Sequence, residues 1–215
     1  MLRRLTLLFA TALTAGAAFA PLPAAAGTQA EEALAPSVAT VLSRAISDRP
    51  VPPDWADRPD ARAWIAEMSK RLAIRMPDEE ERLDLLRTVH YEAVRAGLDP
   101  QLVMAIIHHE SGFKKYAVSV ADARGYMQVM PFWPRLIGSA GQNLFHLRTN
   151  LRYGCVILRH YLDRENGDLY RALGRYNGSL GRPEYPTAVL SAMQRYASAS
   201  APVAIGVTAT LPASR

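Results

Sequence analysis

The chain has 215 residues, of which 49% are hydrophobic and 21% are charged, a composition typical of a globular protein that can bury a core. Its net charge is +5, and residues 97–215 hold 13 basic but only 7 acidic residues. Such a balance suits an anionic polymer such as nucleic acid, acidic lipid or the bacterial wall, although the arginines are scattered rather than aligned on one helical face. The single cysteine, Cys155, excludes an internal disulfide and lies in an apolar stretch, so we interpret it as a core residue.

Residues 1–26 have the features of a secretory signal peptide. Arg3 and Arg4 supply a positive start, residues 5–20 form an uncharged apolar stretch, and small residues lead up to Ala26. We therefore predict a protein that is periplasmic or secreted after cleavage of the signal, which argues against nucleic acid as a partner. An uncleaved membrane anchor is the alternative, although the apolar stretch is short for a membrane span.

Residues 27–77 are predicted to form a linker with a short helical segment. Prolines at positions 50, 52, 53 and 59 interrupt any continuous helix, so we expect residues 27–60 to be largely extended. Apolar residues at helical spacing then predict a short helix from Asp60 to Met76, which Pro77 ends.

From residue 78 onward the apolar residues recur at helical spacing, and no alternating strand pattern appears. Asp99 and Pro100 are typical of a helix cap and first turn. We therefore predict an all-α domain over residues 78–196, followed by a disordered tail, residues 197–215, that is rich in Ala, Ser, Thr and Pro. The predicted helices of this domain cover residues 78–96, 100–113, 132–138, 147–164, 168–176 and 187–196.

The helix that starts at Pro100 ends on an ionisable acid, Glu110. Leu102, Ile106 and Glu110 follow one another at intervals of four and so share one face. Burial on that face would raise the pKa of the carboxyl group, which is what general acid catalysis needs. The alternative is a helix-end glutamate that reaches solvent or pairs with Lys114. Periodicity alone does not separate the two interpretations.

Two polar motifs follow this helix. The run 125–131, GYMQVMP, begins with a glycine that allows a tight turn and contains Gln128, whose amide could bind sugar hydroxyls or an acetamido group. Further on, Tyr176 and Asn177 end a predicted helix before Gly178. An ordinary helix C-cap explains Asn177 and Gly178 equally well.

In this order and spacing, the motifs resemble the catalytic domain of soluble lytic murein transglycosylases, over about Leu83 to Tyr196. The resemblance implies a lysozyme-like, goose-type helical fold that acts on peptidoglycan. The residues that carry it are Glu110-Ser111-Gly112-Phe113, Ser119, the run 125–131 and Tyr176-Asn177-Gly178-Ser179.

The resemblance also implies a role for each matching position. Glu110 would be the only catalytic acid and base, and Ser119 would contact the acetamido region of the reacting sugar. The expected substrate-binding residues are Ser119, Gln128, Met130, Tyr176 and Asn177. Three departures from the family pattern bear on subsite preference: Asp122, Tyr126 and the pair Gly178-Ser179.

The implied reaction needs one carboxyl group, whereas hydrolytic glycosidases usually need two. Glu110 would protonate the oxygen between N-acetylmuramic acid and N-acetylglucosamine while the acetamido group of the substrate stabilises the cation. Glu110 would then remove the proton of the C6 hydroxyl, which closes a 1,6-anhydro ring at the high effective concentration of an intramolecular nucleophile. No cofactor and no metal are implied, and His108-His109-Glu110 is not the HExxH pattern of zinc sites.

Two rival interpretations remain open. One is a goose-type lysozyme-like hydrolase that uses Glu110 with an activated water, for which Asp122 is the nearest candidate partner in sequence. The other is a wall-binding protein without turnover. In every case the expected partner is the glycan strand of peptidoglycan, bound by a monomer. The linker and tail could also recruit a partner protein, and a secretion or flagellar apparatus is one such possibility.

Overall fold

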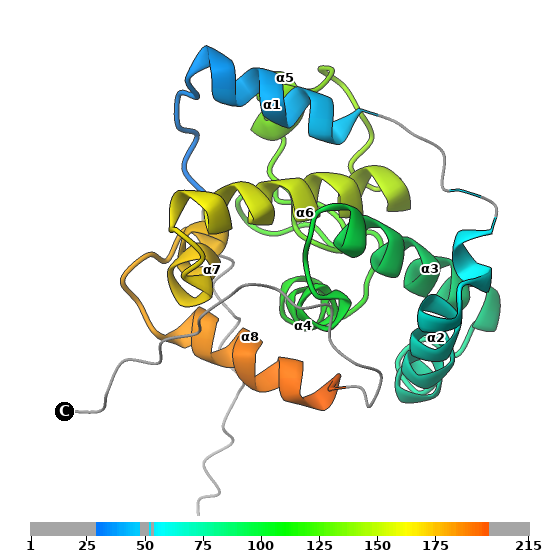
Figure 1. Cartoon of the computed structure of the whole chain (residues 1–215). Helices are drawn as coiled ribbons and strands as arrows, with labels where there is room; N and C mark the ends of the chain where they lie inside the picture. The colour runs from blue at the N-terminus through cyan, green and yellow to red at the C-terminus, as the bar shows by residue number, and fades with distance from the viewer. Residues whose placement is uncertain (1–28, 48–51, 53, 198–215) are drawn as a thin grey trace, which may run out of the picture.

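The computed structural model describes residues 29–47, 52 and 54–197. Within these ranges the chain forms eight α-helices and one 3₁₀-helix, with two isolated β-bridges and no β-strand (Figure 1). The predicted signal peptide and all but the first residue of the predicted tail lie outside these ranges. The elements are α1 (Pro36–Ile46), η1 (Trp55–Asp57), α2 (Pro59–Leu72), α3 (Glu79–Arg95), α4 (Pro100–Glu110), α5 (Phe132–Ile137), α6 (Leu147–Arg164), α7 (Leu169–Asn177) and α8 (Glu184–Arg195).

The all-α prediction is confirmed, and the predicted helices from residue 60 onward are all present. Three of them, α3, α4 and α7, begin where an aspartate side chain accepts a hydrogen bond from a backbone N–H of the first turn. These caps are Asp78, Asp99 and Asp168. The last helix begins at Glu184 rather than Thr187, a difference that places one more tyrosine on a helix.

Helix α4 runs through the middle of the fold. Every residue from Pro100 to Ile107 is buried, and only the last turn, which ends at Glu110, is partly exposed. A helix that is apolar all round must be covered on every side. In Figure 1, α3 and α6 lie on one side of α4 and α8 crosses the other. The fold therefore leaves one accessible end of α4, and that end carries an acid.

The prediction of an extended linker is wrong for residues 36–46, which form α1. Pro36 occupies the first turn, where a proline costs no hydrogen bond, and the prolines that argued against helix all follow Ser47. Leu42 is buried and Val38 packs against the core, so α1 contributes an apolar stripe that α6 covers (Figure 1). A proline disrupts a helix only locally, so the cluster at positions 50–59 places no restriction on residues 36–46.

A buried ion pair holds α1 in place. Glu92 on α3 and Arg152 on α6 are 1% and 4% exposed, and their charged atoms lie 2.6 Å apart. Arg95 also contacts Glu92, at 3.3 Å, and donates to the carbonyl oxygens of Ala45 at 2.6 Å and Ser47 at 3.2 Å. Arg152 donates to the Ser47 carbonyl as well. Two arginines thus bind the carbonyl end of α1, where the helix dipole favours positive charge.

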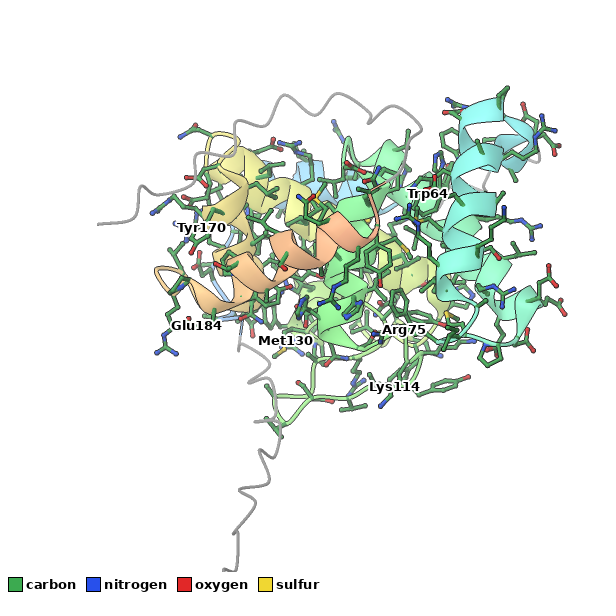
Figure 2. All side chains as sticks on the ribbon, turned by 90° about the horizontal axis from the view of Figure 1, so that it is seen from below. Trp64, Arg75, Lys114, Met130, Tyr170 and Glu184 are labelled. Carbon is green, nitrogen blue, oxygen red and sulfur yellow. The ribbon has the colours of Figure 1, made fainter. Side chains whose placement is uncertain are left out.

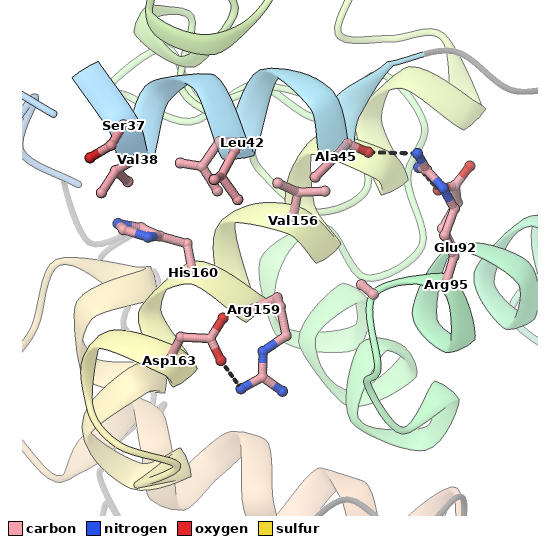
Figure 3. Close-up of a pocket in the computed structure, with 12 residues that line it drawn as sticks. Ser37, Val38, Leu42, Ala45, Glu92, Arg95, Val156, Arg159, His160 and Asp163 are labelled. Atoms are coloured by element: carbon pink, nitrogen blue, oxygen red, sulfur yellow. Dashed lines mark hydrogen bonds and ion pairs between the residues drawn. The ribbon is translucent and has the colours of Figure 1, made fainter. Parts of the chain in front are cut away.

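A cavity of about 470 Å³ lies between α1 and the helices α3 and α6 (Figure 3). Its walls are largely apolar, as at Leu42 and Val156, and the charged groups at its edge include the Arg159–Asp163 pair. Glu110 does not line this cavity. In the described part of the chain, no helix has the length and apolar character needed to cross a membrane.

We expect Glu92→Ala to lower the free energy of unfolding by about 3–5 kcal/mol, because it removes the buried carboxylate that pairs with the Arg152 and Arg95 guanidinium groups. Asp163→Ala removes an exposed ion pair and should cost less than about 1 kcal/mol. Urea unfolding followed by circular dichroism measures both. Equal losses would show that the Glu92–Arg152 pair contributes no more than a surface contact.

Candidate active site

The backbone places Glu110 at an abrupt helix end. Ser111 is the C-cap residue of α4, and its N–H bonds the Ile107 carbonyl at 3.1 Å. Gly112 and Phe113 then take positive φ angles of 58° and 69°, which turn the chain away. The carboxyl group therefore projects from the last turn of a buried helix.

The surroundings of Glu110 favour its protonated form. Burial raises the pKa of its carboxyl group to about 7, while the hydroxyl of Tyr185 donates to Oε1 at 2.6 Å and works in the opposite direction. Glu110 is nevertheless partly exposed, so a ligand can reach it. Lys114 is exposed, and no ion pair between it and Glu110 appears in the described part of the chain. The alternative of a Glu110–Lys114 pair is therefore not what the fold adopts.

Tyr185 reaches Glu110 because α8 is fixed to α4 by two adjacent histidines. His108 Nδ1 and the Tyr196 hydroxyl share a hydrogen bond of 2.7 Å, and His109 Nε2 donates to the Ala188 carbonyl at 2.9 Å. Burial lowers the pKa of both imidazoles, that of His108 to about 4, so both are neutral at pH 7. These histidines thus position α8.

Tyr185 is the site residue that the sequence did not reveal. It lies in the polar run 177–186, NGSLGRPEYP, which separates the helices predicted at residues 168–176 and 187–196. The usable signal was Pro186, since a proline is tolerated in the first turn of a helix and would have allowed α8 to start before Thr187.

The loop after α4 is organised by two of the predicted substrate-binding residues. Ser119 Oγ accepts hydrogen bonds from the N–H groups of Ala121 at 3.2 Å and Ala123 at 3.1 Å. Gln128 Nε2 donates to the carbonyls of Ala117 and Gly125 at 3.1 and 2.9 Å. These bonds leave the Ser119 hydroxyl proton and Gln128 Oε1 unused, and both are groups that could bind a sugar.

Three further hydrogen bonds of 2.8 Å attach residues 126–127 to the surrounding helices. Ser111 Oγ donates to the Tyr126 carbonyl, Asn150 Oδ1 accepts from the Met127 N–H, and the Tyr176 hydroxyl donates to the Met127 carbonyl. Tyr176 is 1% exposed, and burial raises its pKa well above its usual range, so the phenol remains protonated. The turn is thus tied to α4, α6 and α7 at once.

Glycines make this close approach possible. A Cβ on Gly125, which has a φ of 76°, would lie 2.5 Å from Asn150 Nδ2. A Cβ on Gly154, in α6, would lie 2.3 Å from the sulfur of Met127. Larger residues at either position would separate the turn from α6.

The two remaining predicted residues take different places. Met130 is partly buried and packs against the core, and Figure 2, which looks onto α8, shows it on the same face as Glu184. Asn177 is buried as the last residue of α7, directly before Gly178, whose φ of 77° completes a left-handed cap. The alternative of a helix C-cap at Asn177 and Gly178 is therefore realised in the backbone.

Asp122, the candidate second carboxylate, is already engaged. Both of its oxygens accept from the guanidinium of Arg124, at 3.0 and 2.9 Å, and its side chain is 55% exposed. Its surroundings are thus the opposite of those of Glu110: exposed, ion-paired and open to water.

A partly buried acid at the end of a central helix, within a bundle of helices, fits a lysozyme-like domain. Residues 87–186 match the sequence model of the family described as "Transglycosylase SLT domain". The similarity to the SLT domain family therefore covers 100 of the 215 residues of the chain.

Curated relatives agree with this assignment. A segment covering 46% of the chain is 31% identical, over 98 residues, to the transglycosylase of Enterobacteria phage PRD1. A segment covering 45% of the chain is 33% identical, over 112 residues, to the membrane-bound lytic murein transglycosylase C of Yersinia pestis, and a shorter one is 38% identical, over 63 residues, to that of Mannheimia succiniciproducens. The chain spans only 36%, 31% and 16% of the length of these three relatives.

We expect Glu110→Gln to stabilise the protein at pH 8 by about 1–3 kcal/mol. The folded-state pKa of about 7 lies above the ordinary value of 4.5. The wild type therefore loses stability as the pH rises from 4.5 to about 7, because the folded state holds the proton more tightly than the unfolded state does. A glutamine stays neutral and avoids that loss. Urea unfolding at pH 8 and pH 5 measures the free energy of unfolding of both proteins. The difference between Glu110→Gln and the wild type should be smaller at pH 5 than at pH 8. A difference that is constant with pH would contradict the raised pKa.

Tyr185→Phe should raise the pKa of Glu110 above about 7, because the hydroxyl that favours the ionised carboxylate is lost. Carbon-13 NMR of labelled glutamate side chains measures this pKa. Tyr116→Phe, at an exposed tyrosine, is the matched control and should leave it unchanged. A lower pKa in Tyr185→Phe would show that the phenol does not stabilise the carboxylate.

Proposed function

We propose that the protein is a peptidoglycan lytic transglycosylase, which cleaves the β-1,4 bond between N-acetylmuramic acid and N-acetylglucosamine and leaves 1,6-anhydro ends. The observation that carries the proposal is the state of Glu110: one accessible carboxyl group whose pKa of about 7 keeps much of it protonated near neutral pH. The SLT domain match and the names of the relatives support the same activity.

In the proposed reaction Glu110 acts twice. Its protonated form donates to the glycosidic oxygen as the bond breaks, and the carboxylate that results accepts the proton of the C6 hydroxyl as the anhydro ring closes. A pKa close to the working pH suits both steps, because the group must lose and regain a proton in one cycle. Tyr185 stabilises the carboxylate between the two steps, since its hydroxyl donates to Oε1.

The turn after α4 is the proposed binding surface for the muramyl residue. The Ser119 hydroxyl and Gln128 Oε1 would bind the acetamido group and sugar hydroxyls, with Met130 providing apolar contact. Tyr176 and Asn177, which are buried, would act mainly by holding the turn and the end of α7.

Asp122 argues against the hydrolytic rival. A second carboxylate that activates water must be free to accept a proton, whereas Asp122 is paired at both oxygens with Arg124. We further propose that the protein acts on the glycan as a monomer, in the periplasm or outside the cell, and that residues 78–196 form the catalytic domain.

Digestion of purified wall sacculi, followed by mass spectrometry of the released fragments, tests the function. We expect anhydro-muramyl ends, and we expect Glu110→Gln to release them about 10²–10⁴-fold more slowly, the usual contribution of a general acid. Asp122→Asn is the matched control and should keep most of the activity. Reducing muramyl ends would indicate a hydrolase instead, and no release by the wild type would indicate a wall-binding protein.

A further inference from the structure

A closed series of contacts links the turn at residues 126–127 to Gln29, a residue outside the region that matches the SLT family. The Tyr176 hydroxyl binds the Met127 carbonyl, and the chain continues from Met127 to Trp133 in α5. Gln29 closes the series: its Oε1 accepts from the Trp133 indole N–H at 2.7 Å, and its Nε2 donates to the Tyr176 carbonyl. Gln29 lies 58 positions before residue 87, where the SLT match begins.

The chemistry of this bridge suits the amide group of Gln29. The indole nitrogen can only donate and a backbone carbonyl can only accept, so the side chain between them must offer one acceptor and one donor. Gln29 is 6% exposed and Trp133 is 2% exposed, so water does not readily replace either bond. The Tyr176 carbonyl lies at the end of α7, where carbonyl groups lack partners within the helix.

The segment that carries Gln29 is fixed along its length. Glu31 pairs with Arg135 of α5 at 3.3 Å, and Glu32 pairs with Arg164 of α6. The segment then enters α1, whose far end is held by Arg95 and Arg152. Figure 1 shows it running from the first turn of α1 towards α7.

We propose that Gln29 is a positioning residue of the active site, which sets the placement of Tyr176 and, through it, of the turn at residues 126–127, which Ser111, the residue directly after Glu110, also binds. The segment 29–46 would then contribute to catalysis although it lies outside residues 78–196, the proposed catalytic domain. This inference rests on the proposed function for its effect on turnover, but the bridge itself can be tested without it.

The test compares Gln29→Leu and Gln29→Glu with the wild type. Gln29→Leu removes both hydrogen bonds, and we expect kcat on glycan strands to fall about tenfold or more with KM changed less than about twofold, because the chemical step depends on placement more than binding does. Glu31→Gln, on the same segment but at an exposed ion pair, is the matched control and should keep the wild-type kcat.

Gln29→Glu separates positioning from packing. A carboxylate has the right size but presents an oxygen to the Tyr176 carbonyl, whereas a protonated carboxyl group can donate to it. The ratio of the variant kcat to that of the wild type should therefore rise as the pH is lowered from 7 to 5. A ratio that does not change with pH, a wild-type kcat in Gln29→Leu, or an equal loss in Glu31→Gln would each overturn the proposal.

Hydrogen exchange of the Trp133 indole N–H, assigned with Trp133→Phe, reports the bridge independently of activity. We expect slow exchange in the wild type and exchange at least about tenfold faster in Gln29→Leu, since a paired buried donor exchanges only when the structure opens. If the wild type has no activity but shows this difference, the proposed function fails and the bridge stands. Fast exchange in the wild type overturns the bridge.

Discussion

The structure depends on one constraint: α4 is covered on every side up to its last turn, and that turn ends in a carboxyl group. Burial disfavours the charged form of Glu110, while the Tyr185 hydroxyl gives the ionised form one partner. The balance leaves the pKa near neutrality. In the proposed reaction Glu110 must give up a proton and take one back, and a pKa near neutrality suits both steps. A fully exposed acid would have a lower pKa, and a buried acid without a hydrogen-bond donor would have a higher one.

In the proposed function, the residues around Glu110 would both support the fold and take part in the site. His108 and His109 orient α8, and Ser119 and Gln128 hold the loop while keeping one polar function each unused. A turn held by several helices loses little freedom when a ligand binds, so more of the binding energy is available for orientation. The stability that an ionised Glu110 costs the fold is offset by packing elsewhere, a common relation between active sites and stability.

The folded unit is larger than the region that the family comparison matches. The segment 29–46 contributes an apolar helix face, ion pairs to α5 and α6, and a buried amide next to Tyr176. Two arginines hold its far end through the buried Glu92. Because a buried charge needs its partner, removing α1 or changing these arginines would disturb the same α6 that supports the turn through Asn150.

The sequence by itself determined the helices, because apolar periodicity and aspartate caps are local signals: α3, α4 and α6 lie close to where they were predicted. It also singled out Glu110 and the motif at 125–131. Only the tertiary structure decided which tyrosine contacts Glu110, that α1 is a packed helix, and that Gln29 lies beside Tyr176. These facts depend on contacts between residues 50 to 147 positions apart. Local spacing carries no information about such contacts, because they arise only when separate helices pack together.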